Sequence, residues 1–127
     1  MTFHGVLTAL VTPFDQEGVD EMSLRRCVDR QIDAGIAGLV PCGTTGEAPT
    51  LDLKEHHRVI EIVVEQAKGR VPILAGIGSN DTRTAILNAA AASDAGAQGV
   101  LATVPYYNKP TQNGLFLHFQ AIAQATN

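Results

Sequence analysis

Two short segments of this sequence carry hydroxyl side chains in patterns that could bind a ligand or move a proton. The first, Gly43-Thr44-Thr45-Gly46-Glu47, follows an apolar run. Glycine lets the backbone approach a ligand closely, and paired hydroxyls with exposed amides suit a carboxylate or a keto oxygen. A tight turn whose threonines cap their own backbone fits the spacing equally well. We expect Glu47 to anchor this loop by accepting backbone N–H bonds.

The second segment, Pro105-Tyr106-Tyr107-Asn108-Lys109-Pro110, contains both tyrosines of the chain. A tyrosine beside a threonine hydroxyl can pass a proton when a group of matched basicity starts the relay. A stacked tyrosine pair at an interface is the alternative interpretation. The spacing alone leaves both open.

Schiff-base chemistry on a keto group needs a lysine in a dry pocket, where desolvation lowers the pKa of its amine. The lysines of this chain are Lys54 in the first turn of an expected helix, Lys68 before a glycine, and Lys109 in the second segment. We expect all three to be solvated. None of them is therefore predicted to be a covalent nucleophile.

No residue pattern predicts a metal ion or a cofactor. Cys27 and Cys42 lack metal-ligand spacing and are expected to be small buried apolar residues. His56 and His57 would point to different faces of a helix. A nucleotide-binding α/β domain is a minor alternative, because the segment 76–81 lacks the third glycine of a dinucleotide fingerprint.

Four apolar runs, each followed by a stretch of helical period, must position these segments. The expected strands are residues 6–11, 38–41, 71–75 and 99–104. The helices are expected to begin near Asp20 or Ser23, at Asp52 with a capping box to Glu55, near Asn80 or Asp81, and near Gln112. The first three are expected to end at Gly35, Gly69 and Gly96.

This repeat predicts an α/β fold, the (βα)4 half of a (β/α)8 TIM barrel, with residues 1–127 as one domain. The segment 34–40 recurs 61 residues later as 95–101, each copy ending a helix and entering a strand. A doubly wound sheet is less favoured, because the loop Thr12-Pro13-Phe14-Asp15 has no phosphate-binding glycine. A closed barrel commonly has about 250 residues. Four strands alone would leave open edges that need a cover.

Composition narrows the choice of partners and of compartment. The chain has 127 residues, a net charge of -4 and 17% charged residues, with no basic cluster. Nucleic acid and anionic membranes are therefore not expected as partners. No apolar stretch is long enough to span a membrane, and the first residues do not resemble a secretory signal. We expect a cytoplasmic protein.

The two hydroxyl-bearing segments, about 60 residues apart, resemble the dihydrodipicolinate synthase family, and the likeness extends from Gly5 to Asn127. The resemblance implies a Schiff-base lyase that condenses pyruvate with aspartate semialdehyde in lysine biosynthesis, as a homotetramer of tight dimers. N-acetylneuraminate lyases and keto-sugar aldolases share the first segment but usually differ in the second. They are the lesser alternative.

The resemblance also assigns roles. Thr44 would relay protons, Thr45 would hold the pyruvate carboxylate within the loop shaped by Gly43 and Gly46, and Tyr107 would complete a hydroxyl relay in the neighbouring subunit. The family's nucleophilic lysine lies on the sixth strand, which this chain does not reach. We therefore expect the chain to be inactive alone.

An allosteric lysine pocket is a further feature of inhibited members of the family. The positions that match it are Ala48, His56, Gly78, Asn80 and Tyr106. Leu53 and Thr84 depart from it, because inhibited members commonly carry histidine and glutamate there. Loss of that carboxylate removes a partner for the effector's ammonium group, so weak or absent lysine inhibition is expected.

The alternative to an enzyme fragment is a protein of a different functional class, a non-catalytic scaffold that is natural or engineered. Residues 125–127 fall at the expected end of the fourth helix, where a division of the barrel would cut. Two copies, or this chain and a complementary half-barrel, would then cover each other's open strands.

Overall fold

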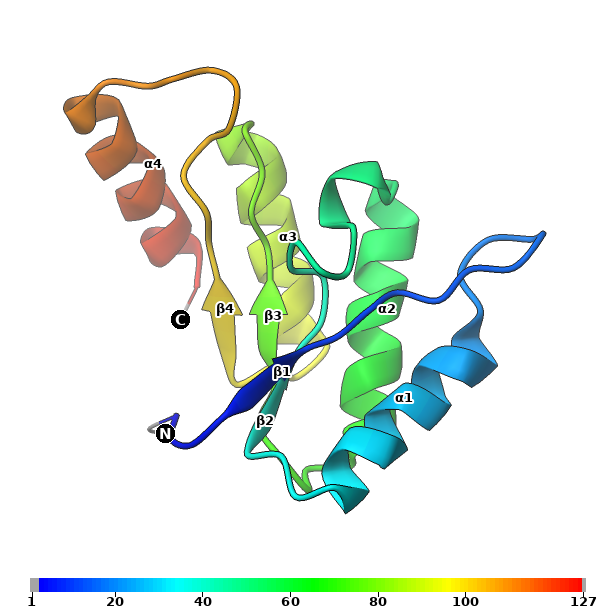
Figure 1. The fold of residues 1–127 in the computed structure, drawn as a ribbon. Coiled ribbons are helices and arrows are strands. Elements are labelled where there is room, and N and C mark those ends of the chain that lie inside the picture. Colours follow the sequence, from blue (N-terminus) through cyan, green and yellow to red (C-terminus); the bar gives the residue numbers. More distant parts are fainter. Residues whose placement is uncertain (1–2, 127) are drawn as a thin grey trace.

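The computed structural model describes residues 3–126 as alternating strands and helices (Figure 1). The strands are β1 (Leu7–Ala9), β2 (Gly38–Val40), β3 (Leu74–Gly76) and β4 (Gly99–Leu101). The α-helices are α1 (Glu21–Asp33), α2 (Leu53–Ala67), α3 (Thr82–Asp94) and α4 (Gln112–Ala125), and a 3₁₀ helix (Ala48–Thr50) precedes α2. The expectations on a secretory signal and on the chain end rest in part on Met1, Thr2 and Asn127, which lie outside the described residues.

The strands run parallel in the order β1-β2-β3-β4. β1 pairs with β2 and β3 with β4. A bridge between Leu39 and Ile73 joins the two pairs, and the Leu39 N–H donates to the Pro72 carbonyl at 3.1 Å. Parallel neighbours need a crossover connection, which each helix supplies. The predicted βα repeat is confirmed, although every strand is shorter than expected.

The third strand shows the largest difference from its predicted range. It begins at Leu74 rather than at Val71. Pro72 has no N–H, so it can accept a hydrogen bond from a neighbouring strand but cannot donate one. The apolar run alone could not reveal this, because hydrophobicity measures burial and not hydrogen bonding.

Side-chain caps fix where the helices begin. The side chains of Asp20, Asp52, Asp81 and Thr111 each accept the backbone N–H three residues further on. At α2 the predicted capping box with Glu55 is formed in both directions. The end of α2 differs from expectation, because Lys68 itself takes the left-handed conformation, with φ of 50°, before Gly69.

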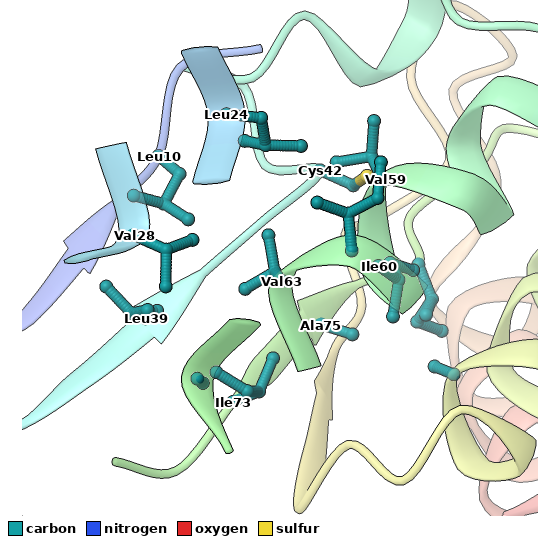
Figure 2. Close-up of a cluster of buried hydrophobic side chains, with 14 of the residues drawn as sticks. Leu10, Leu24, Val28, Leu39, Cys42, Val59, Ile60, Val63, Ile73 and Ala75 are labelled. Atoms are coloured by element: carbon teal, nitrogen blue, oxygen red, sulfur yellow. The ribbon is translucent and has the colours of Figure 1, made fainter. Parts of the chain in front are cut away.

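One face of the sheet carries the core, which Figure 2 shows from close by. Leu39, Ile73, Ala75 and Ile77 are fully buried against apolar side chains of α1, α2 and α3. Burial of an aliphatic side chain stabilises a fold by about 1.5–3 kcal/mol. The opposite face is less covered, since Val11 and Leu101 remain 52% and 42% exposed.

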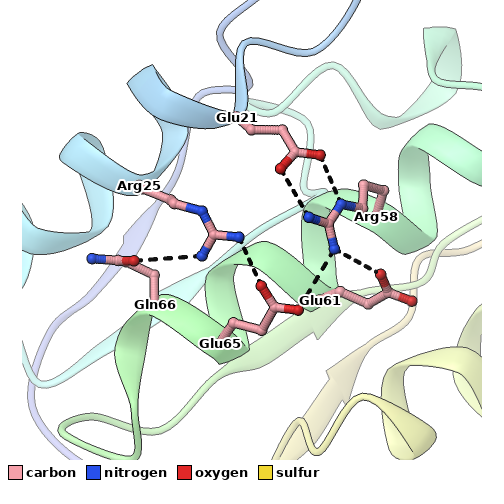
Figure 3. A network of polar contacts seen from close by, with 6 residues as sticks. All are labelled: Glu21, Arg25, Arg58, Glu61, Glu65 and Gln66. Carbon is pink, nitrogen blue, oxygen red and sulfur yellow. Dashed lines mark hydrogen bonds and ion pairs between the residues drawn. The ribbon is translucent and has the colours of Figure 1, made fainter.

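Charged side chains join α1 to α2 on the outer surface of the helix layer (Figure 3). The Arg58 guanidinium donates to both carboxylate oxygens of Glu21, at 2.7 and 2.8 Å, and Arg25 donates to Glu65 at 2.7 Å. The hydrogen bond from Arg58 lowers the pKa of the Glu21 carboxyl.

Within residues 3–126 no helix combines the length and the apolar character needed to cross a bilayer.

Candidate functional site

A cavity of about 330 Å³ lies at the carboxyl ends of β2, β3 and β4. Its lining includes Cys42, Gly43 and Thr44 after β2, Gly76 and Gly78 along β3, and Thr103 after β4. Parallel strands end at the same edge of a sheet, and in (β/α)8 barrels that edge carries the chemistry. The fold thus brings the first predicted segment to a ligand-sized cavity.

Backbone hydrogen bonds shape the loop after β2. The Gly46 N–H donates to the Gly43 carbonyl and the Glu47 N–H to the Thr44 carbonyl, each at 3.1 Å. From the first loop, the buried Thr12 hydroxyl donates to the Gly46 carbonyl at 2.8 Å. Thr12 is a positioning residue that the sequence reasoning missed, because the two residues are 34 positions apart.

Cys42 turns the chain into this loop with a left-handed backbone, φ 53°. A Cβ added to Gly76 would stand 2.0 Å from the Cys42 carbonyl oxygen, so only glycine lets β3 pass beneath this turn. The Cys42 thiol donates to the His56 carbonyl at 3.5 Å, and burial raises its pKa to about 12. The thiol is therefore a structural group and not a nucleophile. Cys27 is only half-buried, contrary to expectation.

The two threonines of the loop are placed differently. Both are exposed, but Thr44 lines the cavity whereas Thr45 is not among its lining residues. Glu47 adopts a left-handed backbone, with φ of 58°, and its side chain caps no backbone N–H. The expectation that its carboxylate anchors the loop is therefore wrong. The Glu47 carbonyl holds the turn instead, by accepting the Thr50 hydroxyl at 2.9 Å.

The tyrosines of the second segment diverge. Tyr106 lines the cavity, while Tyr107 has a left-handed backbone, with φ of 67°, and is 94% exposed. The Tyr107 side chain therefore points to solvent in the part of the chain that the structure describes. The Asn108 side chain donates to the Asn80 carbonyl at 2.7 Å, which ties this loop to the start of α3.

A second cavity of about 130 Å³ adjoins the first and shares Ala48, Gly78 and Tyr106 with it. His56 also lines it, as do the two departing residues Leu53 and Thr84. Four of the five predicted allosteric positions therefore converge. Asn80 does not line this cavity, and its side chain donates to the Asn108 side chain at 3.4 Å.

His56 is 4% exposed, and neither ring nitrogen has a hydrogen-bond partner among the residues that the structure describes. Burial lowers its pKa to about 4, and the neighbouring His57 adds to this effect. The imidazole is thus neutral at pH 7. A buried polar group without partners destabilises the fold, and such groups are concentrated at functional sites.

In the described part of the chain no lysine lines the first cavity, and Lys54, Lys68 and Lys109 are all exposed, as expected. Within residues 3–126 no group of three or more histidine, cysteine, aspartate or glutamate side chains could hold a metal ion. The cavity offers hydroxyls, backbone groups and apolar surface. These groups can bind a small anion or keto compound but cannot form an imine.

Four βα units in sequential order, with a cavity at the strand ends, define one half of a (β/α)8 barrel. The profile of the dihydrodipicolinate synthetase family matches residues 2–127. The chain belongs to this family. The predicted resemblance and the predicted fold are both confirmed.

Named relatives agree with this assignment. The 4-hydroxy-tetrahydrodipicolinate synthase of Pelobacter propionicus is 58% identical over 98% of this chain and 43% of its own length. The dihydrodipicolinate synthase of Aquifex aeolicus has a similar structure, with a TM-score of 0.96 and 46% identity over 98% of this chain and 43% of that one. The chloride-inhibited dihydrodipicolinate synthase of Acinetobacter baumannii, complexed with pyruvate, has a TM-score of 0.95 and 47% identity. The match covers 99% of this chain and 44% of that one. The chain thus spans less than half the length of these relatives.

Proposed function

We propose that residues 1–127 form one (βα)4 unit that supplies the 2-oxo-acid-binding half of a 4-hydroxy-tetrahydrodipicolinate synthase, a cytoplasmic lyase of lysine biosynthesis. The observation that carries this proposal is the cavity at the strand ends, which is lined by Gly43 and Thr44 and, within the described residues, by no lysine. The pyruvate complex of the Acinetobacter baumannii relative supports the choice of ligand.

In this proposal Thr45 holds the pyruvate carboxylate, Thr44 passes protons, and Gly43 and Gly46 shape the loop. The nucleophilic amine comes from polypeptide outside these residues. It adds to the keto carbon, water leaves, and an imine forms. Tyr107, which is 94% exposed, extends the hydroxyl relay into a neighbouring subunit.

Borohydride reduction tests the proposal, because it converts an imine into a stable mass adduct. We expect no pyruvate adduct on the 127-residue chain alone. The completed enzyme, in which residues 1–127 are continued by the remaining residues of the Pelobacter propionicus relative, should form one. The Thr45→Val variant of the completed enzyme should weaken pyruvate binding about tenfold, as expected for a lost hydrogen bond to a charged group. An adduct or steady turnover with the short chain alone would contradict the division of the site.

Self-association is a second candidate function, favoured by the open face of the sheet. Val11 and Leu101 are 52% and 42% exposed there, and β1 and β4 each leave one edge unpaired among the described strands. We propose that a second copy or a complementary half-barrel covers this face. Sedimentation should show a dimer or larger species, whereas a monodisperse monomer would exclude self-association.

We also propose that lysine inhibits the completed enzyme weakly or not at all. Leu53 and Thr84 give the second cavity no carboxylate, and the Asp52 side chain that lines it already accepts the Glu55 N–H at 2.8 Å. Calorimetry of the completed enzyme should detect no micromolar binding of lysine. The double variant Leu53→His, Thr84→Glu should gain affinity.

A further inference from the structure

Thr103 lies two residues beyond β4 and points into the same cavity as Thr44. Side chains along an extended chain alternate between the two faces of a sheet. Val100 and Ala102 pack against the core, whereas Leu101 and Thr103 line the cavity. Thr103 therefore belongs to the open face. The chain beyond β4 and the loop after β2 leave the sheet at the same end (Figure 1).

The side chain of Thr103 leans over the backbone at Gly78, two residues beyond β3. A Cβ added to Gly78 would stand 2.3 Å from the Thr103 Oγ1 and 3.1 Å from its Cβ and Cγ2. Contacts this short show that Thr103 occupies the space that a side chain at position 78 would fill. Glycine at that position is what allows the hydroxyl to reach over the floor of the cavity.

The floor of the cavity is thus backbone, with one hydroxyl on each side. Gly76 and Gly78 of the β3 segment separate Thr44, which follows β2, from Thr103, which follows β4. Among residues 3–126, no charged side chain lines the cavity. A bound acid must therefore be held by hydroxyls and backbone groups. The Thr103 hydroxyl is exposed to the cavity and can donate to such a ligand.

We propose that Thr103 is a substrate-binding residue, whose Oγ1 donates a hydrogen bond to an oxygen of the bound 2-oxo acid from the β4 side. This inference rests on the proposed function and adds a third hydroxyl to Thr44 and Thr45. Gly78 has a matching role, because it makes the room in which this hydroxyl lies.

The test uses the completed enzyme and three variants at position 103 or beside it. Thr103→Val keeps the shape and removes the hydroxyl, and should raise the KM for pyruvate about tenfold with little change in kcat. Thr103→Ser keeps the hydroxyl and should restore a KM within about threefold of the parent's. Gly78→Ala displaces the hydroxyl and should resemble Thr103→Val.

Thr8→Val is the matched control, because the Thr8 hydroxyl donates to Gln31 at 3.0 Å and lies outside the cavity. It should leave the KM unchanged. If Thr103→Val also leaves the KM unchanged while Thr45→Val raises it, the substrate-binding role proposed for Thr103 is wrong and the proposed function stands. If serine fails to restore the KM, the hydroxyl is not the group responsible. If the completed parent enzyme forms no pyruvate adduct, the proposed function fails, and this inference fails with it.

Discussion

The covered face of the sheet and the carboxyl ends of the same strands are built by opposite means. On the covered face, large side chains such as Leu39, Ile73 and Ile77 fill the space between sheet and helices. At the strand ends, space is created by leaving side chains out, as at Gly76 and Gly78. Stability therefore depends on volume in the first region and on close backbone approach in the second.

Backbone conformation shows the same contrast. Over residues 3–126, five non-glycine residues have positive φ, and four of them, Cys42, Glu47, Tyr107 and Lys109, lie in the loops after β2 and β4. Such conformations cost free energy and persist where the surrounding structure holds them, which is commonly at functional sites. These conformations gather in the loops beside the cavity, and one of the four residues, Cys42, lines it.

The largest effect is expected from adding one methyl group at the strand ends. Gly76→Ala would place a Cβ 2.0 Å from the Cys42 carbonyl oxygen and should lower the free energy of unfolding by about 3 kcal/mol. Ile77→Val, the adjacent change on the covered face, should cost about 1 kcal/mol. Urea unfolding of both variants measures the difference. Equal losses would remove the contrast between the two regions.

Acid should destabilise the fold through His56, which lies between the two regions. Its pKa is about 4 in the folded protein and 6.5 as the reference value for the unfolded chain. The unfolded chain therefore takes up a proton first as the pH falls below 6.5, and this contribution to stability is lost progressively down to about pH 4. Between pH 7 and pH 5 the loss from this group should be about 2 kcal/mol.

The His56→Phe variant sharpens this prediction, because an apolar ring removes both unpartnered nitrogens. It should match or exceed the parent's stability at pH 7 and should lose less of it by pH 5. Urea unfolding at both pH values gives the comparison. If the variant loses as much unfolding free energy between pH 7 and pH 5 as the parent does, His56 does not titrate in this way.

Removal of the Thr12 hydroxyl should have a smaller effect, confined to the loop after β2. Thr12→Val leaves the Gly46 carbonyl without its 2.8 Å hydrogen bond and should cost about 1 kcal/mol. The Gly46 amide and its neighbours should then exchange hydrogen faster, while amides of α1 and α2 keep their rates. Uniform acceleration throughout the chain would instead indicate a global role for Thr12.

The smallest effect is expected on the outer surface of the helix layer. Arg58→Met removes the ion pairs with Glu21 and Glu61 and should cost less than about 1 kcal/mol, because half-exposed pairs are screened by water and salt. The difference from the parent should shrink further in 1 M salt. Thermal unfolding at low and high salt measures it.

Much of the fold could be predicted from local sequence, because each element carries its own signals. The cap residues Asp20, Asp52, Asp81 and Thr111 and the apolar spacing set the helices, and the structure places α2 and α3 within two residues of expectation. The segment around Thr44 was predicted to follow a strand, and it does. The Glu47 prediction failed because residue type and spacing do not reveal its left-handed backbone, and its side chain caps no backbone N–H at the 3₁₀ helix.

The sequence by itself determined the βα repeat, the family and the segments that could bind an oxo acid, because propensity, capping and motif spacing are local properties. Only the tertiary structure decided that Gly76 passes beneath Cys42, that Thr12 holds Gly46, and that Thr103 reaches over Gly78. Those contacts join residues that are distant in the chain. Their distances depend on how neighbouring strands align, which no single segment encodes.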